Sequence, residues 1–166
     1  MQTHFDGEGV ATYKKNVVKD GVLCTLLYDL TTAGKAGVAS TGNGKRGSYA
    51  STVEVAPFNF SLCPGTLTEQ ELLAKAENGI YITEVKGLHA GADATTGDFS
   101  IESEGFVIEN GKKAGYVRSF TIAGNFFDLL KRIDSLSDTV DWGIPGGFTV
   151  VGAPAVLVRD MSVAGK

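Results

Sequence analysis

The spacing of apolar residues predicts one well-defined helix in the last third of the chain. In GNFFDLLKRIDSL, apolar side chains recur at helical spacing, and charged side chains fall on the other faces. We therefore predict a helix from Asn125 to Leu136, with Asn125 as its N-cap. Phe126, Leu130 and Ile133 are expected to dock this helix on a sheet, with the Phe126 ring buried.

Two shorter helices are predicted in the first half of the chain. Thr68 and Glu71 have the spacing of a capping box, and the Asn-Gly pair at 78–79 marks the end of the helix that follows. The other short helix is expected over Leu30 to Ala36.

Most of the remaining pattern indicates strands. FVIENGKKAGYVRSFTI contains two strand-like segments around Asn110-Gly111, a dipeptide typical of tight hairpin turns. Lys19-Asp20-Gly21 predicts a second hairpin turn. The segment from Val22 to Asp29 is apolar on both faces, which predicts a buried central strand.

Two further strand predictions concern Gly105 and the end of the chain. The apolar residues Phe99 and Ile101 stand at odd-numbered positions, whereas Phe106 and Ile108 stand at even-numbered ones. On a regular strand these two pairs would face opposite sides, so we expect a bulge or bend at Gly105. FTVV and PAVLVRDMSV are expected to pair as the last two strands.

Together these elements predict the fold class. The chain has 22 glycines and 4 prolines in 166 residues, a composition that fits many turns. We predict a single α+β domain over residues 1–166, mainly antiparallel, with a barrel-like or sandwich core and two or three peripheral helices.

The charge balance narrows the classes of partner. The net charge is −4, and the basic doublets are scattered, so the basic face that nucleic-acid binding requires is not expected. No apolar run is long enough for a membrane span, and no signal peptide is visible, which favours the cytoplasm. In that compartment Cys24 and Cys63 are expected to be buried, reduced thiols.

The residues that commonly carry catalysis do not form a known motif. His4 and His89 are the only histidines, so the paired histidines of a zinc peptidase helix are absent, and no metal site is predicted within this chain. GVASTGNGKRG resembles a phosphate-binding loop but departs from that motif at Ala39 and Arg46. A self-contained hydrolase that uses His89 and Asp98 remains an alternative.

The segment GLHAGADATTGDFS is predicted to be a turn-forming connection between two strands. Its glycines allow sharp reversals, and short polar side chains such as those of Asp93 and Asp98 can accept hydrogen bonds from loop backbone groups.

Several segments, in this order, resemble one family. They are GEGVAT, AGVASTG followed by NGKRG, LCPGTLTEQELL, GIYITEVKGLHAGADATTGDFSIESEGFVIENGK, FTIAGNFFDLLKRI and PAVLVRDMSVAGK. Together they are similar to the C-terminal domain of the TldD/PmbA family of zinc-dependent peptidases and their inactivated homologues. Some members of that family were first described as modulators of DNA gyrase.

The resemblance implies a division of labour between two parts of a longer protein. The family's zinc motif, His-Glu-x-x-x-His, lies in an N-terminal region, so zinc is expected only with that region of an active partner. The resemblance also implies a further cysteine ligand near the C-terminus in the metal-bearing branch. Residues 141–161 contain no cysteine, so the resemblance is closer to the PmbA-like branch that lacks the metal. The sequence therefore does not decide whether this chain is part of an enzyme. The resemblance assigns no catalytic residue to any of its positions.

The expected role is that of a scaffold that binds peptide and joins subunits, either identical or related. Possible contacts with a peptide or subunit are His89, Asp93, Asp98, Phe106 and Ile108. The strands beside the GLHAGADATTGDFS segment and the FVIENGK hairpin are the candidates for an open edge. The alternatives are the His89/Asp98 hydrolase and a DNA-binding regulator; nucleic acid and membrane are not expected partners.

Overall fold

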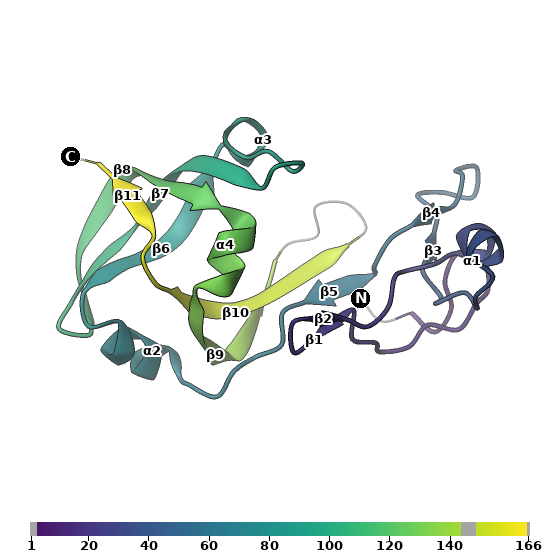
Figure 1. Ribbon diagram of the computed structural model, residues 1–166, viewed down its shortest axis with the longest axis horizontal. Coiled ribbons are helices and arrows are strands. Elements are labelled where there is room, and N and C mark those ends of the chain that lie inside the picture. The colour runs from purple at the N-terminus through teal and green to yellow at the C-terminus, as the bar shows by residue number, and fades with distance from the viewer. Residues whose placement is uncertain (1–2, 144–148, 166) are drawn as a thin grey trace. The chain divides into compact units, whose positions relative to one another are not determined.

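The computed structural model describes residues 3–143 and 149–165, which fall into two compact units (Figure 1). Unit 1 comprises Met1–Ser61 and Trp142–Gly152, and unit 2 comprises Leu62–Asp141 and Ala153–Lys166. Strand residues outnumber helical residues and most strands pair antiparallel, which confirms the α+β prediction. In the described residues the sheets are not closed into a barrel, and of the two predicted cores the fold fits the sandwich. The assignment of one domain to 1–166 stays a prediction.

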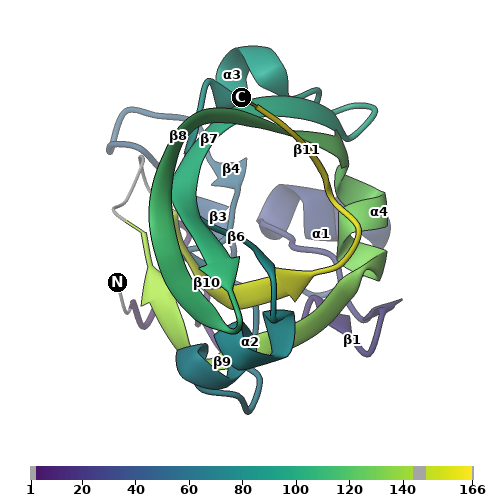
Figure 2. The ribbon, with the colours of Figure 1, turned by 90° about the vertical axis from the view of Figure 1, so that its left-hand side faces the viewer.

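The main sheet of unit 2 has four antiparallel strands. They are β6 (Gly79–Lys86), β7 (Asp98–Glu109), β8 (Lys112–Asn125) and β11 (Ser162–Ala164), in the order β11-β8-β7-β6. Figure 2 shows β7 and β8 as a long, strongly curved pair. Asn110 and Gly111 join them with φ of 49° and 74°, the left-handed pair of a tight hairpin turn, so this predicted hairpin is confirmed.

Gly105 lies where the registers of this sheet shift. A Cβ atom at Gly105 would lie 2.0 Å from the carbonyl oxygen of Tyr81, so only glycine allows β6 to approach β7 this closely. The predicted position of the irregularity is confirmed, because the β6–β7 and the β7–β8 registers both shift beside Gly105. The extra residues lie in the two neighbouring strands, however: Thr83 in β6, and one residue between Val117 and Phe120 in β8.

One face of the four-stranded sheet forms the hydrophobic core of unit 2. Ile101 and Ile122 lie directly opposite each other, and Phe120, which is 3% exposed, lies opposite the fully buried Ser103. Partly buried apolar side chains pack around this centre, namely Ile80, Phe99 and Val117. This cluster therefore lies on the β7–β8 pair, and α2 adds one buried apolar side chain, that of Leu72.

A second sheet has the order β5-β10-β9, with β5 at Asn59–Ser61, β9 at Ile133–Trp142 and β10 at Val150–Val158. Within unit 1, Val150 lies opposite Asn59 in a parallel pairing. The expected pairing of FTVV with PAVLVRDMSV is therefore wrong. Val150 and Pro154 belong to one continuous strand, and Ser162–Ala164 pairs with β8 instead; Phe148 lies outside the described residues.

Four short helices occur in the described residues, whereas the sequence predicted two or three. They are α1 (Leu30–Ala36), α2 (Glu69–Ala76), α3 (Leu88–Gly91) and α4 (Phe126–Lys131). The predicted bounds of α1 and the predicted capping box of α2 are confirmed, because the Thr68 and Glu71 side chains each accept a hydrogen bond from the other's backbone N–H. No helix in this part of the chain is both long and apolar enough to span a membrane.

The predicted helix from Asn125 to Leu136 is correct at its start and wrong at its end. The Asn125 side chain accepts a hydrogen bond from the Phe127 N–H, as an N-cap does. The helix ends at Lys131, because the chain from Ile133 onwards is strand β9. The prediction of a buried docking face is also wrong, since Phe126 and Leu130 are 50% and 46% exposed.

Unit 1 is organised by polar side chains. The buried Asp6 carboxylate accepts hydrogen bonds from the N–H groups of Glu8, Val10 and Gly44, so one acidic group fixes two segments. Its remaining strands are two short pairs: β1 (Val18–Lys19) with β2 (Val22–Leu23), and β3 (Gly44–Lys45) with β4 (Glu54–Val55).

The hairpin turn between β1 and β2 is confirmed, but the buried strand that follows it is not. Asp20 and Gly21 have φ of 52° and 76°, as this turn requires. Strand structure ends at Leu23, however, and Val22, Leu23 and Leu26 are all more than half exposed. The start of the apolar run from Val22 to Asp29 therefore lies at the surface of unit 1, and the run does not form a strand beyond Leu23.

Two phenylalanine substitutions test this assignment of the core. Phe120→Ala should lower the free energy of unfolding by about 3–5 kcal/mol, because it empties a buried site. Phe126→Ala removes the same ring from an exposed position and should cost about 1 kcal/mol or less. Urea unfolding of the two variants measures both values, and equal losses would contradict the assignment.

Candidate functional site

Strand β6 forms an edge of the four-stranded sheet. Among the residues that the structure describes, it pairs only with β7, so the backbone groups along its other side face no partner strand. Most of its residues are exposed, including the apolar Ile82 and Val85 at 39% and 38%. An exposed edge of this kind is able to pair with another extended chain.

A row of aromatic side chains crosses the sheet and ends at this edge. Tyr81 lies directly opposite Phe106, and Phe106 lies directly opposite Tyr116, so the three side chains share one face. The Phe106 and Tyr116 rings meet edge to face, with centroids 5.0 Å apart. We call this the outer face, because Ile101 and the hydrophobic cluster that it forms with Phe120 and Ile122 lie on the opposite one.

Two cations lie against the aromatic row. The Lys113 ammonium lies 3.7 Å from the centroid of the Tyr81 ring, and the Arg118 guanidinium carbon lies 5.4 Å from that of Tyr116. Lys113 also donates a hydrogen bond of 2.7 Å to Glu69 at the start of α2. Burial, and after it the charge of Glu69, raises the pKa of the Tyr81 hydroxyl, so this residue stays neutral.

Acidic side chains continue the outer face beyond the bulge. Glu84 of β6 lies directly opposite Glu104 of β7. Lys86 and Tyr116 both donate hydrogen bonds to Glu104, and the bond from Lys86 is the main reason why the pKa of this carboxyl is lowered. Glu84 accepts no hydrogen bond and forms no ion pair within the described part of the chain.

The predicted residues Asp93 and Asp98 hold the loop after β6 in shape. Asp93 accepts hydrogen bonds from the N–H groups of Thr95 and Thr96, at 2.7 and 3.2 Å, and these bonds lower the pKa of its carboxyl. Asp98 accepts a hydrogen bond of 2.8 Å from the Asn125 side chain, which caps α4. The expected role in turn formation is confirmed, with one short helix, α3, inside the segment.

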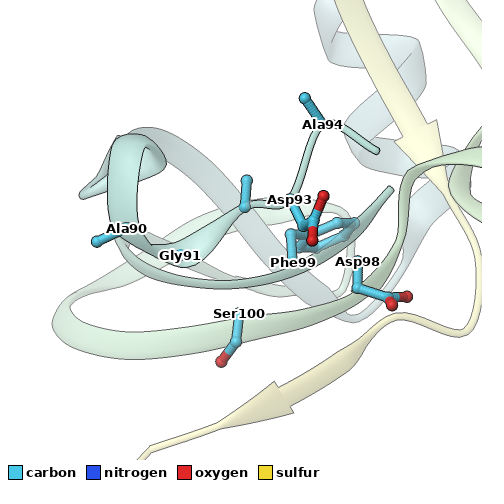
Figure 3. A pocket seen from close by; sticks show the side chains of 8 residues that line it. Ala90, Gly91, Asp93, Ala94, Asp98, Phe99 and Ser100 are labelled. Atoms are coloured by element: carbon cyan, nitrogen blue, oxygen red, sulfur yellow. The ribbon is translucent and has the colours of Figure 1, made fainter. Parts of the chain in front are cut away.

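The loop also borders a shallow pocket, shown in Figure 3. Asp93 and Asp98 are the charged residues of its lining, which otherwise consists of Phe99, Ser100 and small residues of the loop. His89 lies in α3 and does not line the pocket. Within the described residues no hydrogen bond or ion pair joins His89 to Asp98, so the geometry gives the hydrolase alternative no paired acid and base.

The two predicted contacts Phe106 and Ile108 differ in how far their side chains are exposed. The Phe106 ring is half-buried in the aromatic row, whereas Ile108 is 5% exposed. Both belong to β7, which is paired on both sides. Of the two strands that flank the Gly87–Ser100 loop, only β6 therefore offers an open edge.

Within the described part of the chain, the thiols and the acidic residues do not assemble into a metal site. Cys24 and Cys63 are free and exposed, so the prediction that both are buried is wrong. In residues 3–143 and 149–165, no three histidine, cysteine or acidic side chains are placed to hold a metal ion together.

Sequence reasoning missed Tyr81, Tyr116 and Glu84, which make up most of the outer face next to the edge. Tyr81 and Phe106 lie 25 positions apart, and their alignment depends on the register of β6 against β7. The only signal was the alternating pattern around Gly105, which shows that Phe106 and the core residue Ile101 face opposite sides.

Comparison with known proteins decides the family. The model of the PmbA/TldA metallopeptidase C-terminal domain matches residues 1–165. The chain belongs to this TldD/PmbA family. It is 30% identical over 164 residues to the metalloprotease PmbA of Escherichia coli O157:H7, and 32% identical over 170 residues to a TldD homologue of Haemophilus influenzae. These alignments cover 99% and 96% of the chain.

Solved structures of other proteins have the same fold. A candidate modulator of a DNA gyrase from Thermotoga maritima is 42% identical, with a TM-score of 0.82 over 98% of this chain and 35% of its own. TldE from Thermococcus kodakarensis has a TM-score of 0.84 over 98% of this chain and 36% of its own, at 24% identity.

The chain spans about a third of the length of the curated relatives, 33% of the PmbA protein and 35% of the TldD homologue. The two identities are nearly equal, so they do not separate the PmbA-like branch from the TldD-like branch. The branch assignment stays a prediction that rests on the lack of cysteine in residues 141–161.

The ion pair beside the edge predicts how Glu104 titrates. Because the hydrogen bond from Lys86 lowers the pKa of Glu104, replacing Lys86 with Met should move this pKa up towards about 4.3, the ordinary value for glutamate. When folding lowers the pKa of a carboxyl, that carboxyl stabilises the folded state at every pH above the pKa that it has in the unfolded chain. This stabilisation is lost as the pH falls through the lower pKa of the folded state.

Carbon-detected NMR titration of the Glu104 carboxyl measures the shift. Lys75→Met is the matched control, because it removes a different ion pair of unit 2, with Asp134, and should leave Glu104 unchanged. The account of this ion pair is contradicted if Glu104 titrates identically in the Lys86→Met variant and the unaltered protein.

Proposed function

We propose that this chain is the peptide-binding and subunit-assembly part of a TldD/PmbA-type peptide-processing protein, and that it is not catalytic by itself. The observation that carries the proposal is the open edge of β6. An extended peptide that pairs with this edge would gain backbone hydrogen bonds, which make little demand on its sequence. This mode of binding suits a protein that handles unfolded peptides of varied sequence.

The division of labour with the rest of the protein is part of the proposal. The relatives are named metalloproteases and are about three times as long as this chain, which itself contains no His-Glu-x-x-x-His motif. We propose that zinc and the catalytic groups belong to the region that precedes this domain in an active subunit. The domain would then present an extended peptide to that region.

Subunit assembly is proposed to use the exposed side of α4. Phe126 and Phe127 are 50% and 53% exposed, and their rings meet edge to face with centroids 6.1 Å apart. Together with Leu130 they form an apolar surface on a single helix, which is typical of sites that bind protein. An identical or related subunit is the proposed occupant.

Peptides with modified backbones test the proposal for β6. A flexible, unstructured peptide should bind the purified protein, and the same peptide with alternate backbone nitrogens methylated should bind at least about tenfold more weakly, because strand pairing loses several donors. Fluorescence anisotropy with a labelled peptide measures both affinities. Equal affinity for the two peptides would exclude strand addition.

The assembly proposal is tested by mass in solution. The substitution Leu130→Glu places a charge on the α4 surface and should shift the protein from oligomer to monomer in light-scattering chromatography, with its circular dichroism spectrum unchanged. Tyr49→Ser, which removes a fully exposed ring from unit 1, is the control and should leave the mass unchanged. A strictly monomeric unaltered protein would refute the assembly role.

The two alternative functions each have a decisive assay. Peptide turnover by this chain that His89→Ala abolishes would establish the hydrolase. Binding of duplex DNA at moderate salt would establish the DNA-binding regulator, which the net charge of −4 disfavours.

A further inference from the structure

The aromatic row of the outer face ends at the strand to which a peptide would add. Tyr81 is the last member of the row and belongs to β6. In an antiparallel sheet, directly opposite side chains have Cβ atoms about 4.5–5.5 Å apart. A strand added to β6 would therefore bring one of its own side chains against Tyr81, next to the row formed with Phe106 and Tyr116.

The same face carries an acidic side chain, Glu84, that forms no ion pair or hydrogen bond in the described residues. Glu84 and Glu104 lie directly opposite each other, and like charges in this position repel. Lys86 and Tyr116 donate hydrogen bonds to Glu104, whereas exposed Glu84 attracts the Lys86 ammonium only from beyond ion-pair distance. A cation supplied from the open side of β6 would reach Glu84 without displacing any existing bond.

Both features lie on the outer face at a short spacing. Tyr81 and Glu84 are separated by the bulge at Thr83, and their partners Phe106 and Glu104 are two positions apart on β7. Side chains two positions apart on a regular strand point to the same face. One incoming strand is therefore able to contact both residues.

We propose that the β6 edge selects extended peptides in which an aromatic or large aliphatic residue is followed or preceded, two or three positions away, by lysine or arginine. The apolar residue packs against Tyr81, and the basic residue pairs with Glu84. This inference rests on strand addition to β6 and adds a preference for one class of sequence.

Three peptides that differ at one position each provide the test. A reference peptide has tyrosine and lysine two positions apart in an otherwise glycine- and serine-rich extended sequence, and the variants replace lysine with glutamate or tyrosine with alanine. The lysine peptide should bind about fivefold more tightly than the glutamate peptide at low salt, a ratio in the range of an exposed ion pair. This preference should shrink as the ionic strength rises. The tyrosine peptide should likewise bind more tightly than the alanine peptide.

A charge reversal in the protein localises the effect. Glu84→Lys should invert the preference, so that the glutamate peptide binds more tightly than the lysine peptide. Glu54→Lys, which makes the same change of charge at an exposed position in unit 1, is the matched control and should retain the original preference. The two variants should have the same circular dichroism spectrum as the unaltered protein.

The outcomes separate this inference from the proposed function beneath it. If the three peptides bind equally well, and methylation of the backbone still weakens binding, the sequence preference is refuted while strand addition stands. If Glu84→Lys retains the preference for lysine, the assignment to Glu84 is refuted. If no peptide binds at all, both strand addition and the sequence preference are refuted.

Discussion

The main sheet of unit 2 depends on the missing side chain at Gly105. Any Cβ atom there would lie 2.0 Å from the Tyr81 carbonyl oxygen, so another residue would force β6 away from β7. Extra residues in β6 and β8 flank this point, and such bulges increase the local twist and bend of a sheet. The same close approach aligns Tyr81 with Phe106, so the arrangement of the candidate site follows from one backbone contact.

Local signals predicted the elements that are closed by short-range hydrogen bonds. The Asn110-Gly111 hairpin, the capping box of Thr68 and Glu71, and the N-cap at Asn125 all form as expected, because each depends on residues close together in the chain. The place of the irregularity at Gly105 was also predicted from alternation alone. These elements position β6 and β7, so much of the frame of the candidate site was accessible from sequence.

The predictions from sequence failed for elements whose structure depends on pairing between distant segments. The segment after Lys131 keeps a helical apolar pattern but is strand β9, since pairing within a sheet overrode that pattern. The apolar run after Val22 resembles a buried strand, yet nothing local determines what would bury it, and Leu26 is 54% exposed. The aromatic row and the Glu84–Glu104 pair also depend on register between strands far apart in sequence.

The relatives of this chain in the TldD/PmbA family are about three times its length, and we propose that the open edge of β6 connects its structure to peptide binding. Hydrogen exchange of the backbone amides, with and without an unfolded peptide, tests that connection directly. The account predicts that amides of Ile80–Lys86 become protected when peptide is added, whereas amides of β7, already paired on both sides, do not change. Unchanged exchange along Ile80–Lys86 at a saturating peptide concentration would contradict it.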